Sequence, residues 1–428
     1  MEDILEDLFK IYLSCMESYN SKIYQTVNDK YTIIDKSMLT VYLFIKIIED
    51  KNEKNQDVTD ILSNYLLRQV IYSETGNIAF QISDESKFGL YHEILDKLIL
   101  EKFEFKNRTL QRLKYNYKNI ELNKYNELLI FLEDIAEFSI FQRMVLNGKK
   151  EAVSLLDTIK NKIIDKLSII DNDDYFYKEK KEIISLIIDE KFIDSQYGNL
   201  MYIALNLKDV YRYSQIILAV PENVLFHQYT VTVISLIFAE YCNKELKGNI
   251  DIYTILVKSL FHDFPEYKGT EIIAHFKYYN EVTKKMFAEI EENDENELKE
   301  KIGDKFYIII SQAHDGAEGF MSDILDKMLG IMKLCVESEY FNNYTAIKGF
   351  VSVYQGRFKK FLKVQEIDGL KCKSFYLDLL RECYIYIKEH LMERNSEYFL
   401  KYFTKQELEN GRAEIKFLRT NPEAFLRS

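Results

Sequence analysis

An all-helical fold is what this sequence predicts, and three observations support the prediction. The 428 residues include only 3 prolines and 14 glycines, too few for the many tight turns of a β-sandwich or a barrel. Apolar residues recur with the 3.6-residue period of an amphipathic helix along almost the whole chain. Alternating apolar and polar patterns flanked by hairpin turns are essentially missing, so we expect no β-sheet.

The helical period is clearest in a series of separate segments. In chain order these segments lie at 39–48, 155–167, 231–238, 255–261 and 324–329. We expect the helices to break where acidic residues and asparagine gather, because such stretches are usually solvated loops. These expected breaks are 50–57, 171–174 and 291–296. The segment after about residue 350 continues as helices and ends in charged residues.

The length of the chain favours more than one folded unit, since a typical domain has about 150 residues. We expect an N-terminal all-helical domain at 1–207 and a central helical domain at 208–350. A C-terminal helical extension at 351–428 is expected to pack on the central domain.

The N-terminal region also carries a faint echo of the central one. Residues 37–50 and 66–76 resemble residues 230–243 and 259–269 at an offset of 193. One explanation is that any two amphipathic helices rich in Leu and Ile look alike. The other is an ancient duplication whose first copy has degenerated.

Composition excludes several classes of protein. With 47% hydrophobic and 29% charged residues the chain is globular rather than disordered. A formal net charge of −12 disfavours a protein that coats nucleic acid, because backbone phosphates would be repelled. No stretch approaches 18 uninterrupted apolar residues, and the first residues are acidic rather than signal-like. The 5 cysteines form no C-x-x-C pair, so we expect reduced thiols, a cytoplasmic location and no membrane partner.

Two histidines and two aspartates of the sequence form a set that suits a metal ion. His262 and Asp263 are adjacent at the end of the apolar segment 255–261, and His227 lies at the start of another apolar helix. Asp326 lies within an apolar helix, where its carboxylate is costly unless it is paired or bound to a metal. Two imidazoles and two carboxylates suit one divalent ion such as Mn²⁺, Fe²⁺, Co²⁺ or Zn²⁺, with Mg²⁺ a further candidate.

These residues resemble the H…HD…D pattern of the HD-domain phosphohydrolases, and more narrowly the YfbR-like 5′-deoxynucleotidase family. The resemblance covers about residues 208–350 and rests on several spacings at once. Its motifs are Arg212-Tyr213 with Glu222-Asn223-Val224 before His227, then His262-Asp263-x-x-Glu266 with Glu271 and Lys277-Tyr278, then Asp326 with Glu337 and Asn342-Asn343.

The resemblance implies an HD-type helical bundle and a metal-dependent phosphohydrolase. His227, His262, Asp263 and Asp326 would hold the ion, which would polarise a phosphoryl oxygen and supply a nucleophilic water. Glu266, together with Asp263, would be catalytic, with Glu266 the general acid or base. Glu337 is expected to brace the ligand helices.

The implied substrate is a small nucleotide, most simply a (deoxy)nucleoside 5′-monophosphate that loses its phosphate. Arg212 would grip the phosphate in a forked contact, with Tyr213, Glu271 and Lys277 lining the substrate pocket. The sequence departs from the family pattern at Tyr213, where the family has tryptophan, and at Glu271, where it has aspartate. It also departs at Gly269, which is shifted, and at Phe226, where the family often has glutamate. These departures leave the substrate preference open.

Two other function classes stay open at this point. Related HD sites act on phosphodiesters, cyclic nucleotides or nucleoside triphosphates. A non-enzymatic alternative is a metal-stabilised helical scaffold whose N-terminal region binds a partner. If the N-terminal half is a degenerate copy, it would occupy the place of a second subunit, giving an intrachain pseudo-dimer instead of a homodimer.

A second His-Asp dipeptide, His314-Asp315, serves as an internal comparison. The histidine before it, His275, has no E-N-V-like opening, and glycine and alanine surround the dipeptide as in a loop. We therefore expect it to be a decoy, although its loop could approach the site.

Overall fold

The structure is a computed structural model in which most of the helical body is described. The described residues are 30–75, 124–168, 170–213, 217–245, 248–268 and 280–340, together with 22–25 and isolated positions within 8–16 and 406–421. Most of the predicted domain 351–428 lies outside these residues.

The described chain is helical, as predicted, with one small exception. Two short strands, β1 (Lys22–Gln25) and β2 (Lys30–Thr32), pair antiparallel. The all-helical fold class is confirmed, and strands of four and three residues are too short to show an alternating pattern in the sequence.

The described residues form the following helices. In chain order they are α2 (Ile33–Lys51), α3 (Gln56–Thr75), α6 (Lys124–Leu146), α7 (Ala152–Lys166), α8 (Tyr177–Ile188), η4 (Phe192–Asp194), α9 (Gln196–Asp209), α10 (Val224–Glu245), α11 (Ile252–Phe261), η5 (Phe264–Lys268), α13 (Glu281–Ile302), α14 (Asp304–Ser311) and α15 (Gly316–Tyr340).

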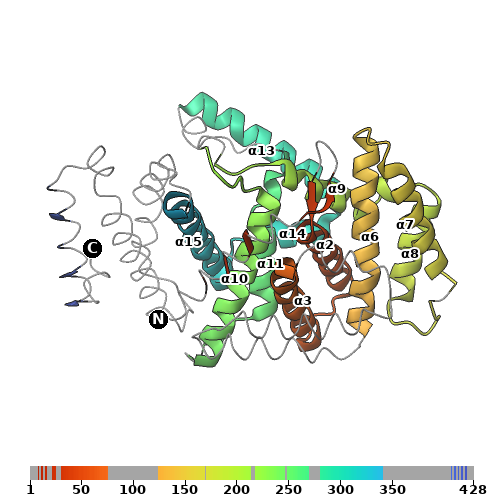
Figure 1. Ribbon diagram of the computed structural model, residues 1–428, viewed down its shortest axis with the longest axis horizontal. Coiled ribbons are helices and arrows are strands. Elements are labelled where there is room, and N and C mark those ends of the chain that lie inside the picture. Colours follow the sequence, from red (N-terminus) through yellow and green to blue (C-terminus); the bar gives the residue numbers. More distant parts are fainter. Residues whose placement is uncertain are drawn as a thin grey trace.

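Helix α10 lies at the centre of this arrangement (Figure 1). It packs against two helices that follow it in the sequence, α11 and α15. It also packs against three that precede it, α2, α3 and α9. Helix α6 joins α2 to the outer pair α7 and α8, which lie at the opposite end of the body from α15 (Figure 1).

The central position of α10 explains its unusual composition. The window Val224–Lys244 is long and apolar enough for a membrane span, yet 89% of it is buried within the protein. An evenly apolar helix of this kind is the core helix of a large helical domain. Among the described residues, no other helix is as long and apolar as this.

The N-terminal helices and the central region share one hydrophobic core. The Tyr42 hydroxyl on α2 donates to Gln228 Oε1 on α10 at 2.6 Å, and the Tyr229 hydroxyl donates to the Leu66 carbonyl at 2.9 Å. Tyr42 also stacks against Phe261 and Phe264, which flank the His-Asp dipeptide. The earlier half of the chain therefore forms one wall under the residues predicted to bind a metal.

Helix boundaries repeat at the offset found in the sequence. Adding 193 to the bounds of α2 gives 226–244, which lies inside α10, and α6 shifted in the same way falls inside α15. Helix α3 shifted by 193 covers α11 and η5. In both halves the three helices contact one another.

Two of the three predicted breaks are confirmed. Helix α2 ends at Asn52, whose φ of 56° is left-handed, and a turn separates α7 from α8. The predicted loop at 291–296 was wrong, because it lies within α13. Acidic residues are compatible with an exposed helix when lysines neutralise them, and here Lys268 contacts Asp294 and Glu297 at 2.5 and 2.6 Å.

Of the five cysteines, Cys15 and Cys242 have described side chains, and both are buried.

Candidate metal centre

Three neighbouring elements bring the predicted ligand residues together. His227 lies in the first turn of α10, where Asn223 Oδ1 caps the helix by accepting from the Phe226 amide at 2.8 Å. His262 is the C-cap of α11, and Asp263 follows in the turn before η5. Asp326 lies in the middle of α15, buried to 2% exposure as its apolar neighbours predicted.

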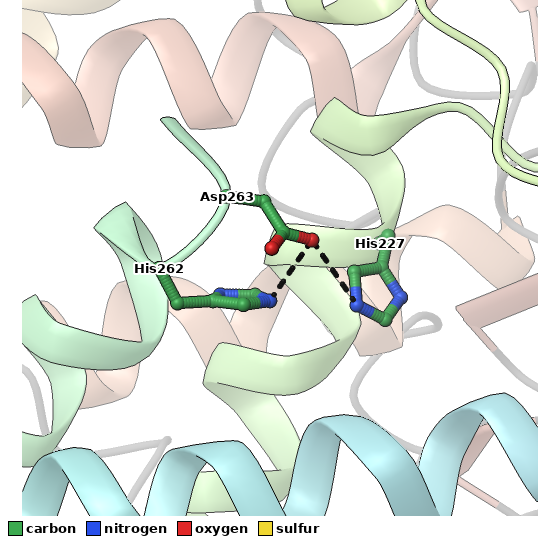
Figure 2. Close-up of side chains that lie close together, drawn as sticks. All are labelled: His227, His262 and Asp263. Carbon is green, nitrogen blue, oxygen red and sulfur yellow. Dashed lines mark ion pairs between the residues drawn. The ribbon is translucent and has the colours of Figure 1, made fainter. Parts of the chain in front are cut away.

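The Asp263 carboxylate lies between the two imidazoles (Figure 2). Its Oδ2 atom is 3.2 Å from His262 Nε2 and 3.7 Å from His227 Nε2. One potential ligand atom from each of these three residues lies within 4.8 Å of the other two. Among the described residues, this is the one group of three or more such side chains with that geometry.

Asp326 joins the group through His227. Its Oδ1 atom lies 2.8 Å from His227 Nε2, the nitrogen that also faces Asp263. Lys327 contacts the other oxygen, Oδ2. The carboxylates of Asp263 and Asp326 thus approach the same imidazole, one from the turn after α11 and the other from α15.

The hydrogen-bonding pattern of His262 suits a metal ligand. Its Nδ1 faces the Ser259 carbonyl oxygen at 2.7 Å, which places an N–H at that position. Its Nε2 is buried and makes no hydrogen bond, although it lies 3.2 Å from Asp263 Oδ2. A buried nitrogen without a hydrogen bond is unusual and is explained if it donates its lone pair to a cation. The residues present therefore fit the divalent ion that the sequence predicted.

Arg212 neutralises both carboxylates of the group. Its Nη1 donates to Asp263 Oδ2 at 2.6 Å, and its Nη2 donates to Asp326 Oδ1 at 3.3 Å. These are the two oxygens that also face His227. The forked guanidinium therefore lies inside the site, against both carboxylates.

The charges in the site shift several pKa values. Burial favours the neutral form of Asp263, but His262 and Arg212 outweigh it and lower the pKa of that carboxyl. Burial also opposes charge on Asp326, while Lys327 and Arg212 lower its pKa well below the usual value. For His262, burial lowers the pKa, but the Asp263 carboxylate outweighs this and raises it to about 9, so without an ion the ring carries both protons and a cation bound at Nε2 would displace one of them. Both carboxylates are thus held in the ionised form that binds cations.

The remaining predicted site residues differ in what the structure says of them. Glu266 lies on η5, half-buried, and its amide donates to the Asp263 carbonyl at 3.1 Å. Tyr213 has a left-handed φ of 58°. Its hydroxyl oxygen lies against Gly330 on α15, so close that a Cβ added to this glycine would be 2.9 Å from it. Glu271 and Lys277 lie outside the described residues.

Glu222 is a functional candidate to which the sequence analysis assigned no role. Its Oε1 lies 3.1 Å from His227 Nδ1, and the side chain is buried to 2% exposure. Burial raises the pKa of a carboxyl, but the contact with His227 and the Arg212 charge lower that of Glu222. The sequence contains Glu222 in the E-N-V motif, five positions before His227. That spacing does not reveal whether the carboxylate contacts the imidazole, or which ring nitrogen it contacts.

The second His-Asp dipeptide lies in the turn between α14 and α15. His314 is outside the ligand group, yet its loop approaches the site. Its Nε2 lies 3.0 Å from the His262 carbonyl oxygen and its Nδ1 lies 2.7 Å from Asp323 Oδ1. With both nitrogens facing oxygen acceptors, His314 braces the backbone of the first dipeptide.

Glu337 is placed to brace the site, as expected. Its carboxylate accepts from the amides of Ala219 and Val220 at 2.6 and 3.0 Å and from Lys333 at 2.9 Å. These contacts tie α15 to the loop that carries Glu222 toward α10.

Comparison with known proteins agrees with this geometry. Residues 199–375 match the family model described as 5′-deoxynucleotidase YfbR-like. These residues form a YfbR-like domain of the HD type. The YfbR-like match begins before and ends after the 208–350 region of the expected resemblance, and it contains all the ligand candidates. No curated protein and no solved structure matches the chain.

Proposed function

We propose that the chain is a metal-dependent phosphohydrolase that removes the 5′-phosphate from (deoxy)nucleoside monophosphates. The observation that carries this proposal is the convergence of His227, His262 and Asp263, with ligand atoms within 4.8 Å of one another. The YfbR-like match supports the substrate class, because that family is described as 5′-deoxynucleotidase-like. The fold alone would not support it, since one fold hosts many activities.

In this proposal His227, His262, Asp263 and Asp326 hold one divalent ion. The contact of 2.8 Å between Asp326 and His227 supports including the fourth residue. The bound ion would polarise a phosphoryl oxygen and supply a nucleophilic water at neutral pH. Mn²⁺, Co²⁺, Fe²⁺, Zn²⁺ and Mg²⁺ are all compatible with a mixed nitrogen and oxygen ligand set.

Arg212 then binds the phosphate. Its guanidinium already lies at the two carboxylate oxygens that face His227, and a phosphate brought to the ion would present competing oxygens to the same fork. Lysine would not replace it, because an ammonium lacks the planar pair of donors. Tyr213, next in the chain, borders this phosphate position, and the roles of Glu271 and Lys277 in the sugar and base pocket remain part of the proposal.

Glu266 transfers the proton. Its position on η5, directly after the dipeptide, keeps its carboxyl on the same short segment as the ligands. A carboxylate there accepts a proton from the attacking water or returns one to the leaving 5′ oxygen. Asp263 contributes by holding the ion and orienting His262.

A substrate screen tests the proposal. Purified chain is assayed with dAMP, dGMP, dCMP, dTMP and AMP in the presence of Mn²⁺ or Co²⁺, and again with EDTA. We expect release of phosphate from at least one monophosphate, and its loss with EDTA. Turnover of a cyclic nucleotide or a triphosphate alone would favour the other HD activities, whereas no turnover of any nucleotide would favour a non-catalytic scaffold.

The chain offers a matched control for this screen. Asp263→Asn and Asp315→Asn each change the aspartate of a His-Asp dipeptide. We expect Asp263→Asn to abolish phosphate release and Asp315→Asn, an exposed residue outside the ligand group, to retain it.

We also propose that the N-terminal half is a copy of the YfbR-like domain that has lost its ligands. The constant offset of 193 between three helices of each half supports this. At that offset Ile34 stands for His227, and Gln69 and Val70 stand for His262 and Asp263. The two halves would then form an intrachain pseudo-dimer with one metal centre.

A further inference from the structure

Glu222 connects the metal centre to a part of the chain far away in sequence. It lies just before α10, where its carbonyl accepts from the Arg212 amide at 2.8 Å. Its two carboxylate oxygens have different partners. Oε1 faces His227 Nδ1 at 3.1 Å, and Oε2 accepts from the Tyr12 hydroxyl at 3.2 Å.

The contact with Nδ1 determines what His227 offers to an ion. A carboxylate at Nδ1 is an acceptor that keeps a proton on that nitrogen. An ion would therefore bind at Nε2, in place of the proton that this nitrogen directs at Asp326 Oδ1, 2.8 Å away. His227 Nε2 is the nitrogen that faces Asp263 and Asp326. Glu222 therefore fixes both the tautomer and the ring orientation that the centre requires.

Tyr12 in turn restricts Glu222. Tyr12 is buried to 1% exposure and lies 210 residues before Glu222 in the sequence. Burial and the neighbouring Glu222 charge raise the pKa of the Tyr12 hydroxyl well above its usual value, which keeps it protonated as a donor. A buried carboxylate with a partner on each oxygen has little freedom to turn away.

We propose that Glu222 is a positioning residue for the metal ligand His227, and that Tyr12 from the N-terminal region holds Glu222 in place. The inference rests on the proposed metal centre. It gives the N-terminal region a direct part in that centre, through a chain of contacts from Tyr12 to Glu222 to His227.

Metal affinity tests the inference without requiring turnover. Mn²⁺ binding to the full chain is measured by titration calorimetry for wild type, Glu222→Ala, Glu222→Gln and Tyr12→Phe. We expect Glu222→Ala to weaken binding by about 10- to 100-fold, the usual effect of losing an outer partner of a ligating histidine. Glu222→Gln keeps an acceptor for Nδ1 and should recover part of the loss. Tyr12→Phe should weaken binding by about 3- to 10-fold, the contribution of one hydrogen bond.

Tyr42→Phe is the matched control. Tyr42 is another buried tyrosine of the N-terminal region, and its hydroxyl bonds Gln228, the residue after His227. We expect this variant to bind Mn²⁺ within about twofold of wild type, although it also loses one buried hydrogen bond. Melting temperatures of all variants show whether each is folded. If Glu222→Ala does not fold, the Mn²⁺ affinities of the conservative variants Tyr12→Phe and Glu222→Gln test the inference.

The outcomes separate the inference from the proposed function. Binding by Glu222→Ala equal to wild type, or equal losses in Tyr12→Phe and Tyr42→Phe, would overturn the inference alone. Wild type that binds Mn²⁺ but hydrolyses no nucleotide would overturn the proposed activity and leave the inference standing. Wild type that binds no divalent ion would overturn both.

Discussion

His227 Nε2 lies 2.8 Å from Asp326 Oδ1, although the two residues are 99 positions apart. The contact joins the first turn of α10 to the middle of α15, two helices that pack directly against each other. Both side chains are almost fully buried, at 1% and 2% exposure. A buried carboxylate against a buried imidazole requires a compensating charge, which Arg212 supplies here and which a divalent cation would also supply.

The first prediction concerns Asp326. Asp326→Asn removes a negative ligand, so we expect Mn²⁺ affinity and phosphate release to fall by more than the ~10- to 100-fold typical of outer-shell changes. Titration calorimetry and a phosphate assay measure the two effects. Asp304→Asn, at the exposed start of α14, is the control and should change neither. Equal Mn²⁺ affinity in wild type and Asp326→Asn would remove Asp326 from the ligand set.

The second prediction concerns removal of the metal. A ligand that binds only the folded chain at 100 times its Kd stabilises it by about 2.7 kcal/mol. We therefore expect saturating Mn²⁺ to raise the melting temperature of EDTA-treated chain by a few degrees. Calorimetric titration should give one ion per chain, because Ile34, Gln69 and Val70 offer no metal-ligand set at the equivalent N-terminal positions. Two ions per chain would contradict the proposed loss of ligands in the first copy.

The third prediction concerns Arg212. Arg212→Lys keeps a positive charge but loses the forked pair of donors, so we expect kcat/KM for the best nucleotide to fall by about 10- to 100-fold through loss of bidentate phosphate contact. Metal affinity should be retained. Arg143→Lys is a fair control, since Arg143 also pairs with a carboxylate, Asp209, at 3.2 Å. If both substitutions lower kcat/KM equally, Arg212 has no special role toward phosphate.

The fourth prediction concerns the aromatic wall under the dipeptide. Phe261 is fully buried and packs against Tyr42, Phe264 and Phe306 at ring distances of 5.2 to 5.4 Å. Phe261→Ala should lower the free energy of unfolding by about 3–5 kcal/mol, because it leaves a cavity beside His262. Urea denaturation measures this. Ile308→Ala, at a side chain that is 51% exposed, should cost far less.

The sequence was sufficient to predict the helical setting of the candidate ligands and the burial of Asp326, because these residues are locally distinctive. Asp326 stands out as a carboxylate in an apolar helix, and His262-Asp263 stands at the end of another, so burial and pairing follow from composition alone. The positions of Glu222 and His314 could not be predicted in this way. Their roles depend on which nitrogen or oxygen faces which partner across separate helices, and sequence spacing carries no such information.

The repeat in the helix boundaries extends what the sequence echo indicated. The echo linked 37–50 with 230–243 and 66–76 with 259–269, which the structure places on α2, α10, α3 and the α11 to η5 segment. The match of α6 to α15 at the same offset does not appear in the sequence echo, because the two helices share length and position while their residues differ. At this offset Glu133 is the residue equivalent to Asp326, and its Oε1 atom accepts a hydrogen bond from the Tyr65 hydroxyl at 3.0 Å.

The last prediction concerns the buried ion pair of Lys333 and Glu337, which ties α15 to the loop before Glu222. Lys333 and Glu337 lie 2.9 Å apart with side-chain exposures of 1% and 0%, and Glu337 also accepts from the amides of Ala219 and Val220. Glu337→Leu leaves Lys333 as an uncompensated buried charge, so we expect a loss of about 3–5 kcal/mol in the free energy of unfolding.

The double variant Lys333→Met with Glu337→Leu separates the two contributions of this pair. Removing both charges restores a compensated interior, so we expect it to recover a substantial part of the stability lost in Glu337→Leu. The amides of Ala219 and Val220 remain without their acceptor in both variants, which limits the recovery. Urea denaturation of the three proteins gives the comparison. Equal stability of the single and double variants would show that the loop amides, rather than the buried lysine, account for the whole effect of Glu337.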